Sequence, residues 1–421
     1  MRRIRKSWCL LLLAGCLCGC ALNREQTAAI PEKSIYRQSD SETGITLSIY
    51  YGTIYNARMM NAIAEDYKAA TGITIAWQAA DSGTNVLKQK FAKGDAPDLF
   101  SMAEFNIPQW KDYLADLSAE PWTGDVYPNS LDAGSVNGKL YAWPHTVEAS
   151  GIVYNKTLFE KAGIVKIPGT LEELKATCRK LEKAGIQSFG ESWMEFGYLA
   201  HLLGAPFNYE ENKEEMTREI YDGEKSFADL KYREVFFEIL DLTLKYGLGS
   251  DSVGYNTLDQ YPDFGEGKMA MMKQGTWVER SLKELGSKEE IGIFPVPFSD
   301  NASENKLQLA TTTFICVNKD SQYKKEALEF LRWWHSYAQK YLVNIDKVAP
   351  PFYSVDTSAL GQLNQDMQTY IKEDKCFDGF GYEYWPTDFQ QNLCEPLQSY
   401  IVGIRTKEQT IQSLDRLFRE Q

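Results

Sequence analysis

Residues 138–164 read GKLYAWPHTVEASGIVYNKTLFEKAGI, and this stretch passes from extended segments into a helix. Its first apolar part predicts a strand that breaks at Pro144, because proline cannot donate to a strand ladder. A second apolar run, residues 151–154, predicts another strand that leads directly into the helix. Thr170 and Glu173 then form the pattern of a capping box at the start of a further helix. A second structural unit therefore starts near Thr170.

Strands and helices alternate in the residues that precede this stretch. Residues 45–51 alternate like a half-buried strand, and a helix is predicted over residues 56–72. Residues 73–80 and 98–102 predict two more strands, with a short helix between them. This order predicts parallel strands with right-handed crossovers. Ligands of such sheets bind beyond the carboxyl ends of the strands, which here are residues 51–55, 79–83 and 102–106.

The rest of the chain continues the same mixture of strands and helices. We expect a helix over residues 232–246, strands over 268–272, 291–297 and 309–318, and a long amphipathic helix over 322–342. In this last helix Phe330, Trp334, Tyr337 and Tyr341 share one face and should form a buried stripe. The sequence therefore predicts an α/β fold.

Length and composition set the broad class of the protein. The chain has 421 residues, 43% of them apolar and 24% charged, which indicates a globular protein of two domains or one large unit. Its net charge is −13, and removing the four positive charges of the first 19 residues would leave −17. This acidic body argues against nucleic acid as a partner and fits neutral or cationic small ligands.

The N-terminus has the pattern of an export signal. Residues 1–19 contain the basic MRRIRK, a short apolar run and small residues, which is typical of a signal peptide and too short to span a bilayer. A metal site or redox pair would need a fold around the three clustered cysteines. The stretches LAGC and LCGC, which end at Cys16 and Cys20, resemble the bacterial lipobox, where the cysteine becomes lipidated. We favour Cys20, with Cys16 as the alternative, and expect residues 20–44 to form a flexible tether.

Enzymatic and metal-binding functions have little support in the sequence. The motifs GxSxG, HExxH and GxxxxGK[ST] are absent, and the three histidines are widely scattered, so we expect no catalysis, metal or cofactor. A glycosidase, which needs two facing carboxylates, remains the rival enzyme class. Among the later cysteines, Cys178 and Cys316 should be buried, whereas the sequence does not decide whether Cys376 and Cys394 pair.

Several motifs resemble the solute-binding proteins of bacterial ABC importers, in particular the large sugar-binding family that is maltose-binding-protein-like. The segment 138–164 resembles that family's G-K-x-Y-x-x-P, Y-N-K and A-G-I signature, and the likeness continues through residue 174. Residues 94–102, 264–277 and 324–334 resemble three further stretches of the family. The resemblance runs from about residue 45 to 350 and is only topological beyond that.

The resemblance implies a two-lobed, Venus-flytrap fold with the ligand in the cleft between the lobes. The first lobe would comprise residues 45–150 plus 312–350, and the second residues 151–311 plus 351–421. The chain would cross between the lobes near residues 150–154, 311–314 and 349–352. Such a protein would be a lipid-anchored monomer outside the cytoplasmic membrane that captures a carbohydrate and closes around it for an ABC permease. A peptide, a polyamine or ferric iron would be the other solutes.

A carbohydrate site combines aromatic platforms with hydrogen-bonding carboxylates. Trp277 is the leading candidate because it follows Gly275 where the family places a stacking aromatic, although a core tryptophan is the competing interpretation. His145 is a further candidate, with a buried structural histidine as the competing interpretation. Glu104 either binds ligand or caps the helix that begins near Ile107. The remaining candidates are Trp193, Glu195, Glu148, Tyr51, Asp81 and Trp385.

Overall fold

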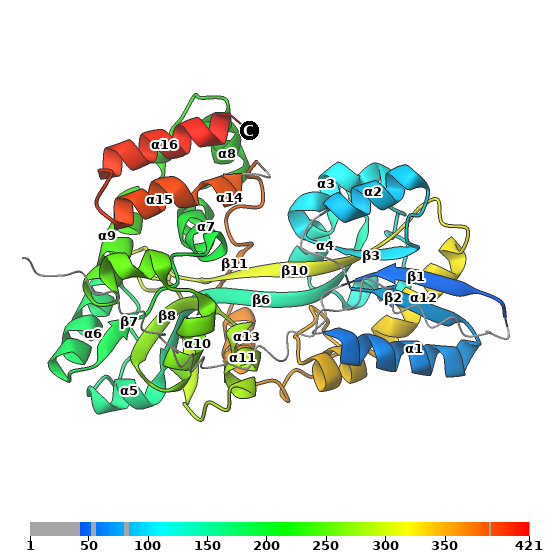
Figure 1. Ribbon diagram of the computed structural model, residues 1–421, viewed down its shortest axis with the longest axis horizontal. Helices are drawn as coiled ribbons and strands as arrows, with labels where there is room; N and C mark the ends of the chain where they lie inside the picture. The colour runs from blue at the N-terminus through cyan, green and yellow to red at the C-terminus, as the bar shows by residue number, and fades with distance from the viewer. Residues whose placement is uncertain (1–42, 52–55, 80–83, 387–388, 421) are drawn as a thin grey trace, which may run out of the picture.

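The computed structural model describes residues 43–51, 56–79, 84–386 and 389–420, and its elements form two lobes (Figure 1). Two long strands, β6 and β10, run from one lobe into the other. The predicted signal segment, most of the predicted tether and the candidate anchors Cys16 and Cys20 lie outside the described residues. Among the helices of the described part, none combines the length and apolar character needed to span a membrane.

One mixed sheet of nine strands passes through both lobes. Its order is β2, β1, β3, β10, β6, β8 and β7, with β11 beside β10 and β9 beside β6. The first three strands pair in parallel, as predicted, and Ile49 of β1 lies between Trp77 of β2 and Leu99 of β3. The strands are β1 (Thr46–Tyr50), β2 (Thr74–Gln78), β3 (Leu99–Met102), β6 (Ala142–Asn155), β7 (Gln187–Phe189), β8 (Met269–Gly275), β9 (Ile291–Phe294), β10 (Leu307–Val317) and β11 (Cys376–Asp378); β4 (Ser135–Val136) and β5 (Lys139–Leu140) form a separate hairpin.

Strand β6 continues through Pro144, so the predicted break at this residue is wrong. Pro144 pairs with Phe314 of β10, whereas the pairing of β6 with β8 begins only at Ser150. Around Pro144 the strand therefore has a strand partner on one side only, where a missing N–H is tolerated. The continuous strand joins Trp143 in the core of the first lobe to Ile152 in the core of the second.

In the first lobe, helices cover both faces of the sheet (Figure 1). Helices α1 (Ala57–Thr71) and α12 (Lys324–Ser336) pack on one face, in a core that contains Ile63 and Phe330. Helices α2 (Asn85–Lys93) and α3 (Ile107–Trp110) pack on the other face, and α4 (Pro128–Ala133) follows them. Gly72 ends α1 in the left-handed conformation, as the sequence predicts.

The predicted long helix over residues 322–342 is interrupted. Helix α12 ends at Ser336, and a π-helix, η8 (Gln339–Asp346), follows. The wider turns of a π-helix change the face that later residues present. Tyr341 is buried as predicted, with its hydroxyl donating to Asp66 at 2.7 Å, whereas Tyr337, which directly follows α12, is 47% exposed, so its predicted burial is wrong.

The second lobe packs most of its helices around the end of the sheet formed by β7 and β8. The predicted start of α6 is confirmed, because the Thr170 hydroxyl accepts from the Glu173 N–H at 3.3 Å. Its helices are α5 (Lys156–Lys161), α6 (Leu171–Lys183), α7 (Phe196–Gly204), α8 (Lys213–Tyr221), α9 (Arg233–Lys245), α10 (Thr257–Gly265), α11 (Val278–Glu284), α13 (Gln362–Lys372), α14 (Phe389–Asn392), α15 (Cys394–Ile401) and α16 (Lys407–Arg419). Cys178 and Cys316 are buried as predicted, and Cys376 and Cys394 are not disulfide-bonded.

A third segment joins the lobes beside β6. The Val147 N–H donates to the Ala349 carbonyl at 2.8 Å, which places this segment along the free edge of the strand. Phe352 still packs in the first lobe, 5.5 Å from Trp143, whereas Leu360 belongs to a core cluster with residues of β8 and β9. The chain therefore leaves the first lobe between Phe352 and Leu360.

Candidate functional site

A cavity of about 500 Å³ lies where the two lobes meet. The first lobe contributes Arg58 and Asp346 to its wall, and the second lobe contributes Trp277 and Arg280. Glu148 of the crossing strand β6 lines it as well. The cavity is therefore shared between the lobes and would change shape if the lobes moved relative to one another.

Trp277 presents a partly exposed indole at the end of β8. Its Nε1 donates to the Gln274 side chain at 2.7 Å, which fixes the orientation of the ring. Gly275 has to be a glycine, because an added Cβ would lie 2.2 Å from the indole and 2.4 Å from the Ala149 carbonyl oxygen. The absence of a side chain at Gly275 thus leaves room for the indole where β6 and β8 approach each other closely.

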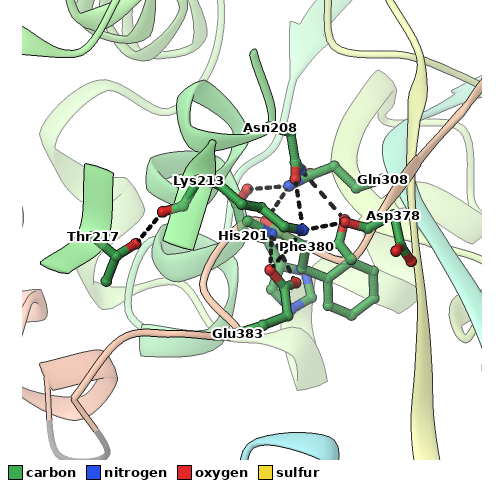
Figure 2. Close-up of polar contacts among 10 residues, drawn as sticks. His201, Asn208, Lys213, Thr217, Gln308, Asp378, Phe380 and Glu383 are labelled. Carbon is green, nitrogen blue, oxygen red and sulfur yellow. Dashed lines mark hydrogen bonds and ion pairs between the residues drawn. The ribbon is translucent and has the colours of Figure 1, made fainter. Parts of the chain in front are cut away.

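Further aromatic rings pack beside Trp277, and together with it they form what we call the aromatic wall. The imidazole of His201 on α7 lies 5.2 Å from the Trp277 ring and stacks on Tyr382, with ring centroids 5.6 Å apart and an interplanar angle of 26°. Phe380 lies 4.7 Å from His201. The Gln308 amide of β10 ties the two segments together by donating to the His201 and Phe380 carbonyls at 3.2 and 2.5 Å (Figure 2).

Carboxylates stand next to these rings. Burial raises the pKa of Glu148, although a hydrogen bond with Thr312 opposes the shift. Burial, followed by the negative charges of Glu383 and Asp378, raises the pKa of Glu104 to about 8. Glu104 belongs to the first lobe, whereas Glu383 and Asp378 belong to the second. These three residues form an acidic group that spans the gap between the lobes.

A lysine partly neutralises this acidic group. Lys213 at the start of α8 donates to Glu383 at 3.1 Å, to Asn208 at 3.4 Å and to the Asp378 carbonyl (Figure 2). Glu383 also accepts from the Gly381 N–H, so its carboxylate is held by a cation and by the backbone. One lysine facing three carboxyl groups leaves an excess of acceptor oxygens, which suits ligands with hydroxyl or ammonium donors.

A direct contact joins the lobes at the wall of the cavity. Arg280 of α11 donates to the Asp346 carbonyl at 3.3 Å and lies 3.7 Å from the Asp346 carboxylate. Asn56, just before α1, donates to the same carboxylate at 2.9 Å. Burial raises the pKa of Asp346 to about 6, although the charge of Arg280 and the hydrogen bond from Asn56 oppose this shift.

Two sequence candidates of the first lobe lie in its core. The Tyr51 hydroxyl is 2.8 Å from Nε2 of His145, and both side chains are buried and pack against Trp334. Burial lowers the pKa of His145 to about 3, so the imidazole is neutral. The structure therefore favours the alternative interpretation of His145, a structural histidine in the core of the first lobe.

Two candidates of the second lobe also lie apart from the cavity. Trp193 is fully buried, and its Nε1 donates to the Thr243 hydroxyl at 3.4 Å. Glu195 accepts from the N–H and hydroxyl of Thr257 at 3.0 and 2.9 Å, which fixes the start of α10. We therefore leave Trp193 and Glu195 out of the proposed site.

The remaining candidates divide into two groups. Trp385 is mostly buried, yet it borders a second interlobe hollow of about 800 Å³ together with Tyr384 of the second lobe and Gln109 of α3. Asp81 lies outside the described residues. Trp277, Glu148 and Glu104 are the candidates that the structure places at the interlobe surface, with Trp385 at its border.

Sequence reasoning did not select several residues that lie beside Trp277 and the acidic group. His201, Tyr382 and Lys213 come together from α7, α8 and the segment after β11. Tyr382 and Glu383 stand in the same aromatic GFGYEYWP stretch that suggested Trp385. The aromatic character of this stretch is the sequence feature that could have pointed to them. Within the described ranges, no group of three or more His, Cys, Asp or Glu residues could hold a metal ion.

The chain matches a known protein family. The model for bacterial extracellular solute-binding proteins matches residues 62–369. The chain belongs to this family. The two lobes and the cleft between them therefore have the architecture that the family resemblance implied.

Similar proteins place this solute-binding protein among sugar-binding relatives. It is 22% identical to the melibiose/raffinose/stachyose-binding protein MelE of Bacillus subtilis over 59% of this chain, and 23% identical to the multiple sugar-binding protein of Streptococcus mutans over 60%. It is 24% identical to the maltotriose-binding protein of Pyrococcus abyssi over 66%. The matches span 59–61% of the length of these curated relatives.

Solved structures share the fold of this solute-binding protein. RafE of Streptococcus pneumoniae in its apo form superposes with a TM-score of 0.74 at 18% identity, over 89% of this chain and 97% of RafE. A sugar transporter protein of Bacillus licheniformis in complex with stachyose gives a TM-score of 0.69 at 21% identity, over 89% of this chain and all of that chain. These similarities confirm the predicted two-lobed α/β fold.

Proposed function

We propose that this protein captures an oligosaccharide in the cleft between its lobes and delivers it to an ABC permease. The observation that carries the proposal is the indole of Trp277, partly exposed in a cavity shared by both lobes, with Glu148 in the same wall. A sugar ring stacks its apolar face on an aromatic ring and donates its hydroxyls to carboxylates. Relatives named for raffinose, stachyose and maltotriose support the same class of ligand.

The protein would act by binding and closure, without catalysis. Closure of the two lobes would bury the sugar and present a surface that the permease distinguishes from the open form. Trp277, Glu148 and Glu104 would contact the ligand, with His201 and Tyr382 completing the aromatic wall.

We propose further that the body is a monomer held at the outer face of the cytoplasmic membrane by a lipidated Cys20, with Cys16 as the alternative anchor. The basic and apolar residues before these cysteines and the membership in an extracellular family support this location. Mass spectrometry of the mature N-terminal peptide would identify the modified cysteine. An N-terminus without acyl chains at either residue would contradict the anchor.

A thermal-shift panel tests the class of solute. Raffinose, stachyose, melibiose and maltotriose should raise the melting temperature with increasing concentration, because a ligand that binds the folded state stabilises it. Oligopeptides and linear polyamines serve as the competing classes. A shift with peptides alone would place the protein outside the sugar class.

A polyamine is the second candidate, because the carboxylates of Glu104, Asp378 and Glu383 face one another around a single lysine. A shift with spermidine and none with sugars would select it. A glycosidase is separated from both by chromatography of the sugar after prolonged incubation with the protein, since a binding protein returns the sugar intact.

A further inference from the structure

Lys273 is a buried lysine on the strand that leads to Trp277. It lies on β8 with only 3% of its surface exposed, and its ammonium donates to the Ser150 hydroxyl of β6 at 2.6 Å. Both carboxyl oxygens of Glu191 accept from the Lys273 backbone N–H, at 2.9 and 3.0 Å, and burial raises the pKa of this carboxyl group to about 8. Burying an ammonium is unfavourable, and burial accordingly lowers the pKa of Lys273 to about 7, although the nearby Glu191 opposes this shift.

The Ser150 hydroxyl lies between Lys273 and His201. Its Oγ lies 3.4 Å from Nδ1 of His201. Below about pH 7 Lys273 is an ammonium, which has three donors and no acceptor, so the Ser150 oxygen accepts from Lys273 and its own proton remains available for Nδ1. In the described part of the chain, Nδ1 of His201 is the only hydrogen-bonding partner of this hydroxyl besides the Lys273 amine.

We infer that Lys273, acting through Ser150, holds His201 in the neutral tautomer that carries its proton on Nε2, and so supplies the aromatic wall with an N–H donor for a ligand oxygen. This role rests on the proposed function. The opposite tautomer would leave the buried Ser150 proton without an acceptor, which costs stability. Burial and the Lys273 charge keep the pKa of His201 well below its ordinary value, so the ring stays neutral.

The position of the ring makes the donor useful. His201 is partly exposed on α7, stacks on Tyr382 and meets Trp277 edge to face. Sugars carry ring and hydroxyl oxygens that need donors, and an ionised carboxylate supplies only acceptors. A fixed imidazole N–H would therefore complement Glu148 and Glu104 in choosing the orientation of the sugar.

The tautomer can be measured without any ligand. Long-range ¹H–¹⁵N spectra of the uniformly ¹⁵N-labelled protein contain three imidazoles, and His201→Gln assigns the relevant one. At a pH below about 7, where Lys273 carries its proton, we expect an unprotonated Nδ1 and a protonated Nε2 in the wild type. A protonated Nδ1 in the wild type would overturn the inference.

Two variants test the cause. Ser150→Ala removes the hydroxyl with little change of volume, and Lys273→Met frees the Ser150 oxygen to accept from Nδ1–H. Each should introduce the Nδ1–H form, and the first keeps the test available if the second does not fold. Lys268→Met, on a 57% exposed lysine that pairs with Asp263 beside β8, should leave the spectrum unchanged. An unchanged His201 spectrum in Ser150→Ala contradicts the role of the hydroxyl.

Raffinose titration then tests the donor role. Ser150→Ala should bind raffinose roughly tenfold more weakly than the wild type, the range expected for one hydrogen bond. Equal affinity together with a changed tautomer would overturn the donor role. A wild type with the expected tautomer but no affinity for any sugar of the panel would overturn the proposed function and the donor role, while the tautomer assignment would stand.

Discussion

The indole ring of Trp277 meets the imidazole ring of His201 edge to face, with their centroids 5.2 Å apart. The two residues come from the end of β8 and from the middle of α7. Their contact depends on the absence of a side chain at Gly275, and it builds one aromatic wall from two elements of the second lobe. Four consequences of this arrangement and of the charges around it can be measured.

Gly275→Ala should both destabilise the protein and displace the indole. The added methyl would lie 2.2 Å from the Trp277 ring and 2.4 Å from the Ala149 carbonyl, so strand or ring has to move. We expect a loss of about 1–3 kcal/mol in the free energy of unfolding, measured by denaturant titration. Gly124→Ala, where the new methyl meets open space, is the matched control. Equal stability of both variants would show that β6 and β8 are less closely apposed.

Glu104→Gln should remove a loss in the free energy of unfolding that the wild type undergoes as the pH rises. The pKa of Glu104 is raised to about 8, first by burial and then by Glu383 and Asp378, so its protonated form stabilises the folded state at low pH. That contribution is complete below about pH 4.5 and is lost as the pH rises through about 8. Glu104→Gln should therefore become more stable than the wild type between pH 5 and 9, by on the order of 1 kcal/mol.

Thermal melts across this pH range check the effect of Glu104. Glu172→Gln is the control, because the pKa of this exposed carboxyl is lowered by Lys175 and it stays ionised over the whole range. Parallel curves for the wild type and Glu104→Gln would mean that Glu104 is solvated and does not face the second lobe.

Asp346→Asn should shift the two lobes toward a more open arrangement. The substitution weakens the contact with Arg280, which joins α11 of the second lobe to η8 of the first. An ion pair of this kind contributes up to about 1 kcal/mol, so the open population should rise severalfold. Small-angle X-ray scattering of the ligand-free protein should show a larger radius of gyration.

Glu284→Gln separates this interlobe effect from a general loss of charge. Glu284 accepts from the same Arg280 guanidinium at 3.0 Å, but both residues belong to α11 and to one lobe. The control variant should keep the radius of gyration of the wild type. An equal increase in both variants would assign the effect to the helix and not to the contact between the lobes.

The fold could be predicted where its signals are local. Gly72 and Thr170 mark helix ends because backbone conformation and capping depend on neighbours in sequence. Pro144 misled the prediction because its tolerance depends on which strands lie beside β6. Tyr337 likewise lies outside the predicted stripe because α12 ends just before it, which side-chain periodicity does not reveal.

The site could be predicted only in part, for a similar reason. Trp277 and Glu148 were found because each stands in a motif at a strand, where the resemblance places the cleft. His201 and Tyr382 were not selected, because their stacking joins segments far apart in the chain. Trp193 shows the reverse case, since a tryptophan in a polar stretch looks available although the helices of the second lobe enclose it.

Titration calorimetry with raffinose on the wild type and on Trp277→Ala tests the central claim most directly. Trp333→Ala, in the first lobe and outside the cavity lining, is the control for losing an indole. We predict one binding site in the wild type, unchanged affinity in the control and at least about tenfold weaker binding in Trp277→Ala, because the stacking platform is gone. Equal raffinose affinity in the wild type and Trp277→Ala would contradict a carbohydrate site in this cleft.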